Sequence, residues 1–301
     1  TTPDQVLITN GGKQAIFNLF QVLLNPGDEV LLPAPYWLSY PEMAALAGAR
    51  TITIPSTAVD GFQLDLKALE SRISPNSRLL ILNTPSNPTG RVMQRSELEE
   101  LAELVGRHPN LMVMCDEIYE YLLADGLAHH SFAAVAETIR HRCFTVNGFA
   151  KGWAMTGWRL GYLAGDETVI KAAAALQSQS TSNVCSFAQR GAVAAIEASR
   201  DCVREMAVSY NQRRTLLVEG LQALPGITLV PPKGAFYAFP ELPEACGDSV
   251  SFCQRALEQE GLAIVPGGAF GDDRCVRLSC AVSRETITDG LSRLARLLPA
   301  D

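Results

Sequence analysis

The stretch "TVNGFAKGWAMTGWRLGY", residues 145–162, holds two cations in an almost uncharged neighbourhood. Lys151 is followed eight residues later by Arg159, with small or apolar residues between them. An amine among apolar neighbours and close to another cation has its charged form disfavoured, so it becomes a usable nucleophile and base near neutral pH. The pattern therefore makes Lys151 the first candidate for catalysis.

Three further polar groups follow predicted strands. Asn87 comes after "RLLILN", Asp116 and Tyr119 end or follow "LMVMCDE", and Lys151 itself follows "CFTVN". In an open parallel sheet, ligands collect beyond the carboxyl ends of the strands. We therefore expect an amide, a carboxylate with a phenol, and an amine to meet at one edge of a sheet.

A possible phosphate site precedes the first helical pattern. In "TNGGKQAIFNLF", Gly11 and Gly12 come before a run with helical period, so backbone N–H groups and a helix N-terminus could hold a phosphate. Each motif taken alone has an ordinary alternative: a turn for the two glycines and for "NPTG", an N-cap for Asp116, a solvated loop for Lys151, and core packing for Trp37. Their order along the chain and their convergence on one crevice favour the functional interpretation.

The elements that must position these residues alternate between strand and helix. Short β-rich runs, "EVLLP", "TITIP", "RLLILN", "LMVMCDE", "CFTVN" and "RLGYLAG", are separated by amphipathic or long connecting segments, which predicts an α/β fold with a largely parallel sheet. The pattern becomes helical from about residue 182 to 224. We predict a large domain over residues 1–205 and a smaller α+β domain over residues 206–301, divided within the long helix.

Composition limits the classes of partner and compartment. The net charge is -7 and neither Lys nor Arg clusters, so we expect no nucleic-acid or anionic-membrane partner. No apolar run approaches the roughly 18 residues of a membrane span. The eight cysteines form no C-x-x-C pair and the four histidines lie far from any cysteine pair, which predicts reduced core thiols, no metal site and a cytoplasmic location.

Six motifs in order resemble one family over residues 6–298. "GGKQA", "PAPYW", "NTPSNPTG", "CDEIYEYL", "NGFAKGWAMTGWRLGY" and "VRLSCA" are similar to those of the class I pyridoxal-phosphate-dependent aminotransferases, especially the bacterial aspartate aminotransferase branch. The resemblance implies the type I fold of pyridoxal-phosphate transferases, in which a three-layer, mostly parallel sheet flanked by helices is joined to a smaller α+β domain. It also implies a homodimer.

The resemblance assigns a role to each matching residue. Lys151 would form the Schiff base with pyridoxal 5'-phosphate and then carry the proton, and Asp116 would pair with the pyridine nitrogen. Tyr119 and Asn87 would bind the phenolic oxygen. The remaining contacts would be Arg159, Gly11, Gly12 and Lys13 to the phosphate, Trp37 to the ring face, and Arg277 to the substrate α-carboxylate.

Lys13 limits the range of candidate substrates. In the bacterial branch its position is associated with the distal carboxylate of acidic substrates, which favours aspartate or glutamate with a 2-oxo acid; a plain phosphate contact is the competing role. Three other functions remain open. They are a prephenate or aromatic aminotransferase, a lyase on the same scaffold, and a non-enzymatic cofactor-binding module of a transcription regulator.

Two features depart from the family pattern. Many relatives carry serines three and one residues before the lysine, where this chain has Gly148 and Ala150. The family also has a substantial segment before "VLITNGGKQ", including an arm that closes over substrate and a tyrosine that reaches the neighbouring subunit. We expect this chain to be a fragment without that segment, which would affect closure, dimer stability and activity.

Overall fold

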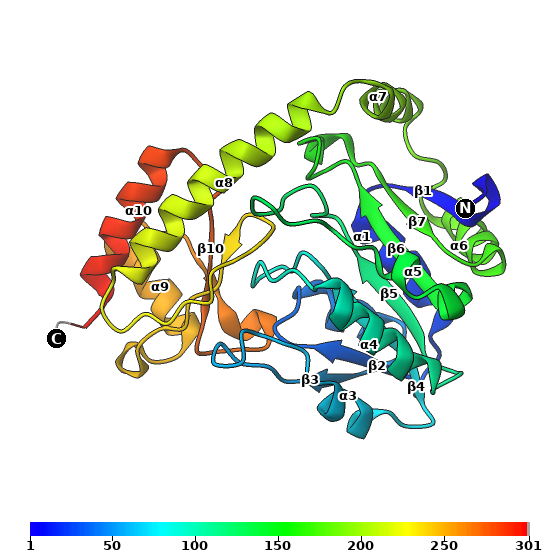
Figure 1. Cartoon of the computed structure of the whole chain (residues 1–301), viewed down its shortest axis with the longest axis horizontal. Coiled ribbons are helices and arrows are strands. Elements are labelled where there is room, and N and C mark those ends of the chain that lie inside the picture. Colours follow the sequence, from blue (N-terminus) through cyan, green and yellow to red (C-terminus); the bar gives the residue numbers. More distant parts are fainter. Residues whose placement is uncertain (300–301) are drawn as a thin grey trace.

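A seven-stranded sheet forms the centre of the larger lobe in the computed structural model, which describes residues 1–299 (Figure 1). The strands lie in the order β1-β7-β6-β5-β4-β2-β3. Their bounds are β1 Val6–Thr9, β2 Glu29–Pro33, β3 Arg50–Ile54, β4 Ser77–Asn83, β5 Met112–Asp116, β6 Cys143–Gly148 and β7 Gly161–Ala164. Because β4, β5 and β6 are neighbours in the sheet, the three strand ends selected from the sequence lie side by side.

The expected mostly parallel sheet is confirmed, with two antiparallel exceptions. β3, β2, β4, β5 and β6 pair in parallel, whereas β7 runs antiparallel to both β6 and β1. All six predicted strands are present, but β1 is an additional edge strand that the sequence analysis did not identify. The antiparallel β6–β7 pair turns the chain back after Lys151, so that Arg159 returns to the same edge of the sheet.

Helices cover both faces of this sheet and complete a three-layer arrangement. Sheet residues such as Val30 and Leu32 pack with α1, α2 and α6 on one face, while Leu31 packs with α3, α4 and α5 on the other. This alternation with period two explains why the strands read as continuous apolar runs. The helices of this lobe are α1 Gly12–Leu23, α2 Ser39–Leu46, α3 Leu66–Arg72, α4 Arg95–Gly106, α5 Phe132–Val135 and α6 Glu167–Ser180, with the 3-10 helices η1 Pro3–Gln5, η2 Glu137–Arg142 and η3 Thr156–Trp158.

The C-terminal part forms a second lobe beside the sheet, and the long helix α8 runs along both (Figure 1). A three-stranded antiparallel sheet, ordered β8-β10-β9, packs with the C-terminal half of α8, with α9 and with α10 around its own apolar core. The elements are α7 Ser186–Glu197, α8 Asp201–Gln222, β8 Tyr237–Ala238, η4 Glu244–Cys246, α9 Ser249–Glu260, β9 Val265–Pro266, η5 Gly267–Phe270, β10 Val276–Ser279 and α10 Arg284–Leu297. The division into domains at residue 205 stays a prediction.

Two composition-based expectations can be compared with the structure. All eight cysteines carry free thiols, and six of them are buried, as expected of core thiols, whereas Cys185 and Cys202 are exposed. None of the helices within residues 1–299 combines the length and the apolar character needed to cross a membrane.

Candidate active site

A cavity of about 320 Å³ lies between the carboxyl edge of the large sheet and the C-terminal lobe. Nine of the ten candidate residues line it, and Gly11 adjoins it through Gly12. The lining consists of Gly12, Lys13, Ile16, Trp37, Tyr40, Asn83, Asn87, Asp116, Ile118, Tyr119, Ala150, Lys151, Thr156, Arg159, Tyr237 and Arg277. The candidate residues therefore converge on one cavity.

Asn83, the last residue of β4, ties two strand ends together. Its Nδ2 donates to the carbonyl oxygen of Asp116 at 2.9 Å, and its Oδ1 accepts from the backbone N–H of Asn87 at 2.7 Å. Asn87 and Asp116 are both buried. Two hydrogen bonds from one amide thus hold the loop after β4 against the end of β5, and this fixes Asn87 relative to Asp116.

Asp116 is a buried carboxylate with two donors. The Tyr40 hydroxyl donates to Oδ2 at 2.9 Å, and the backbone N–H of Ile118 donates to Oδ1 at 3.2 Å. Burial raises the pKa of Asp116 to about 6, although both hydrogen bonds oppose the rise. A carboxylate in such a site gains from a cationic partner, because a positive charge nearby would stabilise its ionised form.

Lys151 lies three residues beyond the end of β6 and is half-buried. Its Nζ lies 5.4 Å from the ring centroid of Phe236 and 5.9 Å from that of Tyr119. Burial lowers the pKa of Lys151, and the charges of Arg159 and Arg277 lower it further, while Asp116 opposes them. The amine is therefore easier to deprotonate than an ordinary lysine, which is the direction expected from the sequence.

The guanidinium of Arg159 lies against the N-terminus of α1. Its Nη2 donates to the carbonyl oxygen of Asn10 at 3.2 Å and its Nη1 to that of Thr156 at 3.1 Å. Gly11 has φ +82°, and a Cβ there would lie 2.5 Å from Nη2 of Arg159. Glycine therefore permits a cation and the free N–H groups of a helix start to face the same space, an arrangement that binds anions.

Arg277 on β10 reaches the cavity from the second lobe. Its Nη1 donates to Oδ1 of Asn87 at 2.9 Å, and its Cζ lies 4.5 Å from the ring centroid of Tyr237 and 4.8 Å from that of Phe270. Since arginine has donors only, the Asn87 oxygen must face Arg277 and the Asn87 NH₂ group faces away. That NH₂ group can donate to a ligand.

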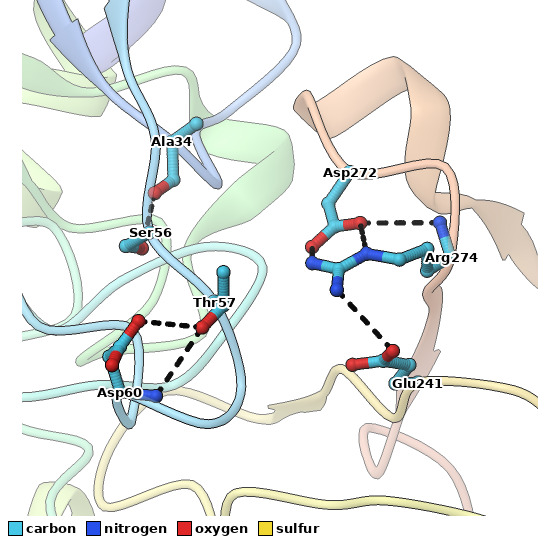
Figure 2. Close-up of polar contacts among 7 residues, drawn as sticks. All are labelled: Ala34, Ser56, Thr57, Asp60, Glu241, Asp272 and Arg274. Atoms are coloured by element: carbon cyan, nitrogen blue, oxygen red, sulfur yellow. Dashed lines mark hydrogen bonds and ion pairs between the residues drawn. The ribbon is translucent and has the colours of Figure 1, made fainter.

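The turn that leads into β10 is held by a charged cluster, shown on the right of Figure 2. Arg274 donates through Nε and Nη2 to both carboxylate oxygens of Asp272, at 3.0 and 2.8 Å, and its Nη1 lies 3.4 Å from Glu241. A bidentate arginine–carboxylate pair has a well-defined geometry. The cluster fixes the start of the strand that carries Arg277.

Lys13 and Trp37 line the outer part of the cavity. The Nζ of Lys13 lies 5.0 Å from the ring centroid of Trp37, and Trp37 meets Tyr40 edge to face with centroids 5.3 Å apart. Lys13 is exposed, so its charge is available to a ligand that enters from solvent.

Three cavity residues were missed by the sequence analysis. Asn83 ends β4 and could have been found by the strand-end rule that selected Asn87 and Asp116. Tyr40 and Tyr237 carry hydroxyls that bond Asp116 and Tyr119, and no spacing in the sequence indicates either pairing.

Comparison with known proteins gives consistent matches over almost the whole chain. The family model described as "Aminotransferase class I and II" matches residues 1–294. A bifunctional aspartate aminotransferase and glutamate/aspartate-prephenate aminotransferase of Petunia hybrida is 45% identical over 99% of this chain and 64% of its own length. A probable aspartate/prephenate aminotransferase of Rickettsia bellii is 40% identical over 97% of this chain and 76% of its own length.

Solved structures match in the same way. The aspartate aminotransferase from Rhizobium meliloti superposes with a TM-score of 0.94 at 36% identity, covering 98% of this chain and 76% of that one. The Thermus thermophilus aspartate aminotransferase with maleate has a TM-score of 0.92 at 44% identity, covering 99% and 77%. The chain spans just under two thirds of the length of its plant relatives, 64% and 63%, and about three quarters of that of the bacterial ones.

Proposed function

Because the chain belongs to the aminotransferase class I and II family, we propose that it moves an amino group between an L-amino acid and a 2-oxo acid. Pyridoxal 5'-phosphate is the cofactor of this family. The observation that carries the proposal is a single cavity that holds a half-buried amine, a buried carboxylate and a cation at a helix N-terminus.

The donors and charges of the cavity fit this cofactor. Asp116 would pair with the ring nitrogen, and Trp37 would cover a ring face. Arg159 and the start of α1 would hold the phosphate, where the absence of a Cβ at Gly11 keeps space for the guanidinium. The Tyr119 hydroxyl and the Asn87 NH₂ group, which faces away from Arg277, would donate to the phenolic oxygen.

When bound, the cofactor supplies an aldehyde and a ring that accepts electrons. The residues then have separable tasks. Lys151, with its lowered pKa, would attach the cofactor and later move a proton to or from the substrate α-carbon. Arg277 would orient the substrate through its carboxylate. Asp116 would hold a proton on the ring nitrogen, because a buried carboxylate stabilises a neighbouring positive charge.

The substrate class follows from Lys13 and from the relatives. A lysine at the outer part of the cavity is placed to receive a second carboxylate, which supports aspartate or glutamate as the amino donor. The Thermus structure that matches this chain is named with maleate, a dicarboxylate. Several relatives are named aspartate/prephenate aminotransferases, so prephenate, also a dicarboxylate, is the second candidate substrate.

A homodimer is proposed from the surface beside Arg159. Trp158 and Phe187 are 48% and 76% exposed, and both line a surface hollow together with Arg159. Large exposed apolar side chains grouped in this way mark interaction surfaces. A second copy covering them would also close the phosphate end of the cavity. A cytoplasmic location stays a prediction.

Reductive labelling tests the function directly. Borohydride added with pyridoxal phosphate should attach the cofactor to the peptide that contains Lys151, as read by mass spectrometry. The Lys151→Ala variant should lose this label, whereas Lys171→Ala, which alters an exposed lysine on α6, should keep it. Labelling that survives in Lys151→Ala would refute the assignment.

A spectroscopic test separates an enzyme from a binding module. Aspartate added to the cofactor-loaded protein should change its visible absorbance, because the amino group is transferred to the cofactor. The Lys13→Ala variant should raise KM for aspartate by about 10- to 100-fold, the loss of one charged hydrogen bond, and leave KM for phenylalanine unchanged. A spectrum that responds to the cofactor and to no amino acid would instead support the regulator module.

A further inference from the structure

Two tyrosine hydroxyls meet inside the cavity. The oxygens of Tyr119 and Tyr237 lie 2.9 Å apart, and the two residues are 4% and 8% exposed. Tyr119 follows β5 in the large lobe, whereas Tyr237 begins β8 in the C-terminal lobe. The contact therefore joins the sheet edge that carries Asp116 to the small sheet that carries Arg277.

The number of protons on the two hydroxyls determines which of them donates the hydrogen bond. Burial raises the pKa of both phenols above the ordinary value, so each keeps its single proton near neutral pH. Only one of the two protons can lie between the oxygens, and the other must point elsewhere. If Tyr119 donates to a ligand, Tyr237 must be the donor to Tyr119.

Tyr237 also supports the residue proposed to bind the substrate carboxylate. The Cζ of Arg277 lies 4.5 Å from the Tyr237 ring centroid, within the range of a cation–π contact. β8 and β10 pair antiparallel, with Tyr237 opposite Ser279, so the backbone also fixes the ring beside Arg277. One side chain thus touches both the phenol and the guanidinium.

We propose that Tyr237 is a positioning residue that donates its hydroxyl hydrogen to Tyr119, so that Tyr119 donates to the phenolic oxygen of the cofactor, while its ring supports Arg277. The inference rests on the proposed function, because it needs a cofactor oxygen in front of Tyr119. A hydroxyl that accepts a hydrogen bond becomes a better donor, since successive bonds polarise each other. Tyr237 would therefore strengthen the hydrogen bond from Tyr119 without touching the cofactor.

The visible absorbance of the lysine-bound cofactor, titrated with pH, reports this effect. A donor to the phenolic oxygen stabilises its negative charge and lowers the basicity of the nitrogen that shares its proton. Tyr119→Phe, which removes the donor, should raise the spectroscopic pKa by about 1 to 2 units. Tyr237→Phe should raise it by about 0.1 to 0.7 unit, the cooperative part of that bond.

Further variants separate the role of the Tyr237 hydroxyl from that of its ring. Tyr119→Phe/Tyr237→Phe should titrate like Tyr119→Phe alone, because Tyr237 acts through Tyr119. Tyr237→Phe should leave KM for the amino acid unchanged, whereas Tyr237→Leu, which removes the ring under Arg277, should raise KM by about 2- to 30-fold. Tyr210→Phe is the matched control, since Tyr210 stacks on Phe236 in the same lobe and should titrate like the unmodified protein.

The outcomes that would overturn the inference are distinct from those that concern the function. A titration in Tyr237→Phe equal to that of the unmodified protein, while Tyr119→Phe shifts, would refute the role of Tyr237 alone. Additive shifts in the double variant would refute transmission through Tyr119. If the unmodified protein shows no visible absorbance band after pyridoxal phosphate is added, the proposed function is refuted, and the inference that rests on it is refuted as well.

Discussion

Replacing Tyr40 with phenylalanine should raise the pKa of Asp116 from about 6 to roughly 7. The Tyr40 hydroxyl donates to Asp116 at 2.9 Å, with the two residues 1% and 6% exposed. A hydrogen bond of this kind contributes about 1.5 to 3 kcal/mol to stability when the acceptor is charged and about 0.5 to 1.5 kcal/mol when it is neutral. The difference of about 1 to 1.5 kcal/mol favours the ionised carboxylate and corresponds to about one pKa unit.

The sign of the effect on stability follows from the raised pKa. Folded Asp116 binds a proton more tightly than unfolded Asp116, so the free energy of unfolding falls as pH rises from 3.8 to about 6. That loss amounts to about 3 kcal/mol, from about 2.2 pKa units. In Tyr40→Phe the fall continues to about pH 7. The variant should therefore be less stable by about 0.5 to 1.5 kcal/mol at pH 5.5, and by about 1.5 to 3 kcal/mol at pH 8.5.

Urea unfolding of the cofactor-free protein at the two pH values measures this difference. Tyr210→Phe serves as the control, because it also removes one tyrosine hydroxyl while its ring can still stack on Phe236. The change in its free energy of unfolding should not depend on pH. In the Asp116→Asn background, where no carboxyl titrates at this position, the cost of Tyr40→Phe should be the same at both pH values. A cost that does not grow with pH in the Asp116 protein, or one that still grows in the Asp116→Asn protein, would refute the reasoning.

Three further predictions concern Arg277 and two small residues near Lys151. Arg277→Lys should lower kcat/KM for the amino acid by about 10- to 100-fold, because an ammonium cannot reproduce the planar fork, and Arg213→Lys on the surface of α8 should not change it. At Gly148 an added Cβ would lie 2.6 Å from the Leu160 oxygen, so the Gly148→Ser protein should unfold at a lower temperature in a thermal melt. Ala150 lines the cavity, so the hydroxyl added by Ala150→Ser can donate to the cofactor and should tighten cofactor binding by about 2- to 10-fold.

The part of the site that the sequence predicted depends on one topological rule. Parallel strands end at the same edge, so a polar residue directly after a buried run can be placed without knowing any side-chain contact. The rule selected Asn87, Asp116 and Lys151, and the structure brings all three to one cavity. Applied consistently it would also have selected Asn83, whose amide holds the ends of β4 and β5 together.

Two features of the fold that the sequence did not predict, the direction of β7 and the presence of β1, also have physical causes. β7 alternates between buried and half-buried residues and contains no charged side chain, so its pattern is the same for a parallel and an antiparallel strand. β1 has four residues at the sheet edge, with Ile8 exposed, and so lacks the buried run that identified the other strands. Strand direction and edge strands depend on pairing partners, which the local pattern does not contain.

The hydrogen bonds that tyrosine hydroxyls make in the site could not be predicted from the spacing of residues in the sequence. Tyr40 contacts Asp116 within the large lobe although 76 residues separate them, and Tyr237 contacts Tyr119, 118 residues away, where the two lobes meet. A motif places a carboxylate or an amine at a strand end, but whether that group is charged depends on how deeply it is buried and on which donors surround it. Residues that would touch the cofactor can therefore be recognised from motifs. Those that set the protonation of the touching groups come from elements with no such motif, and relatives that differ at Tyr40 or Tyr237 should differ in pH dependence even when their motifs are identical.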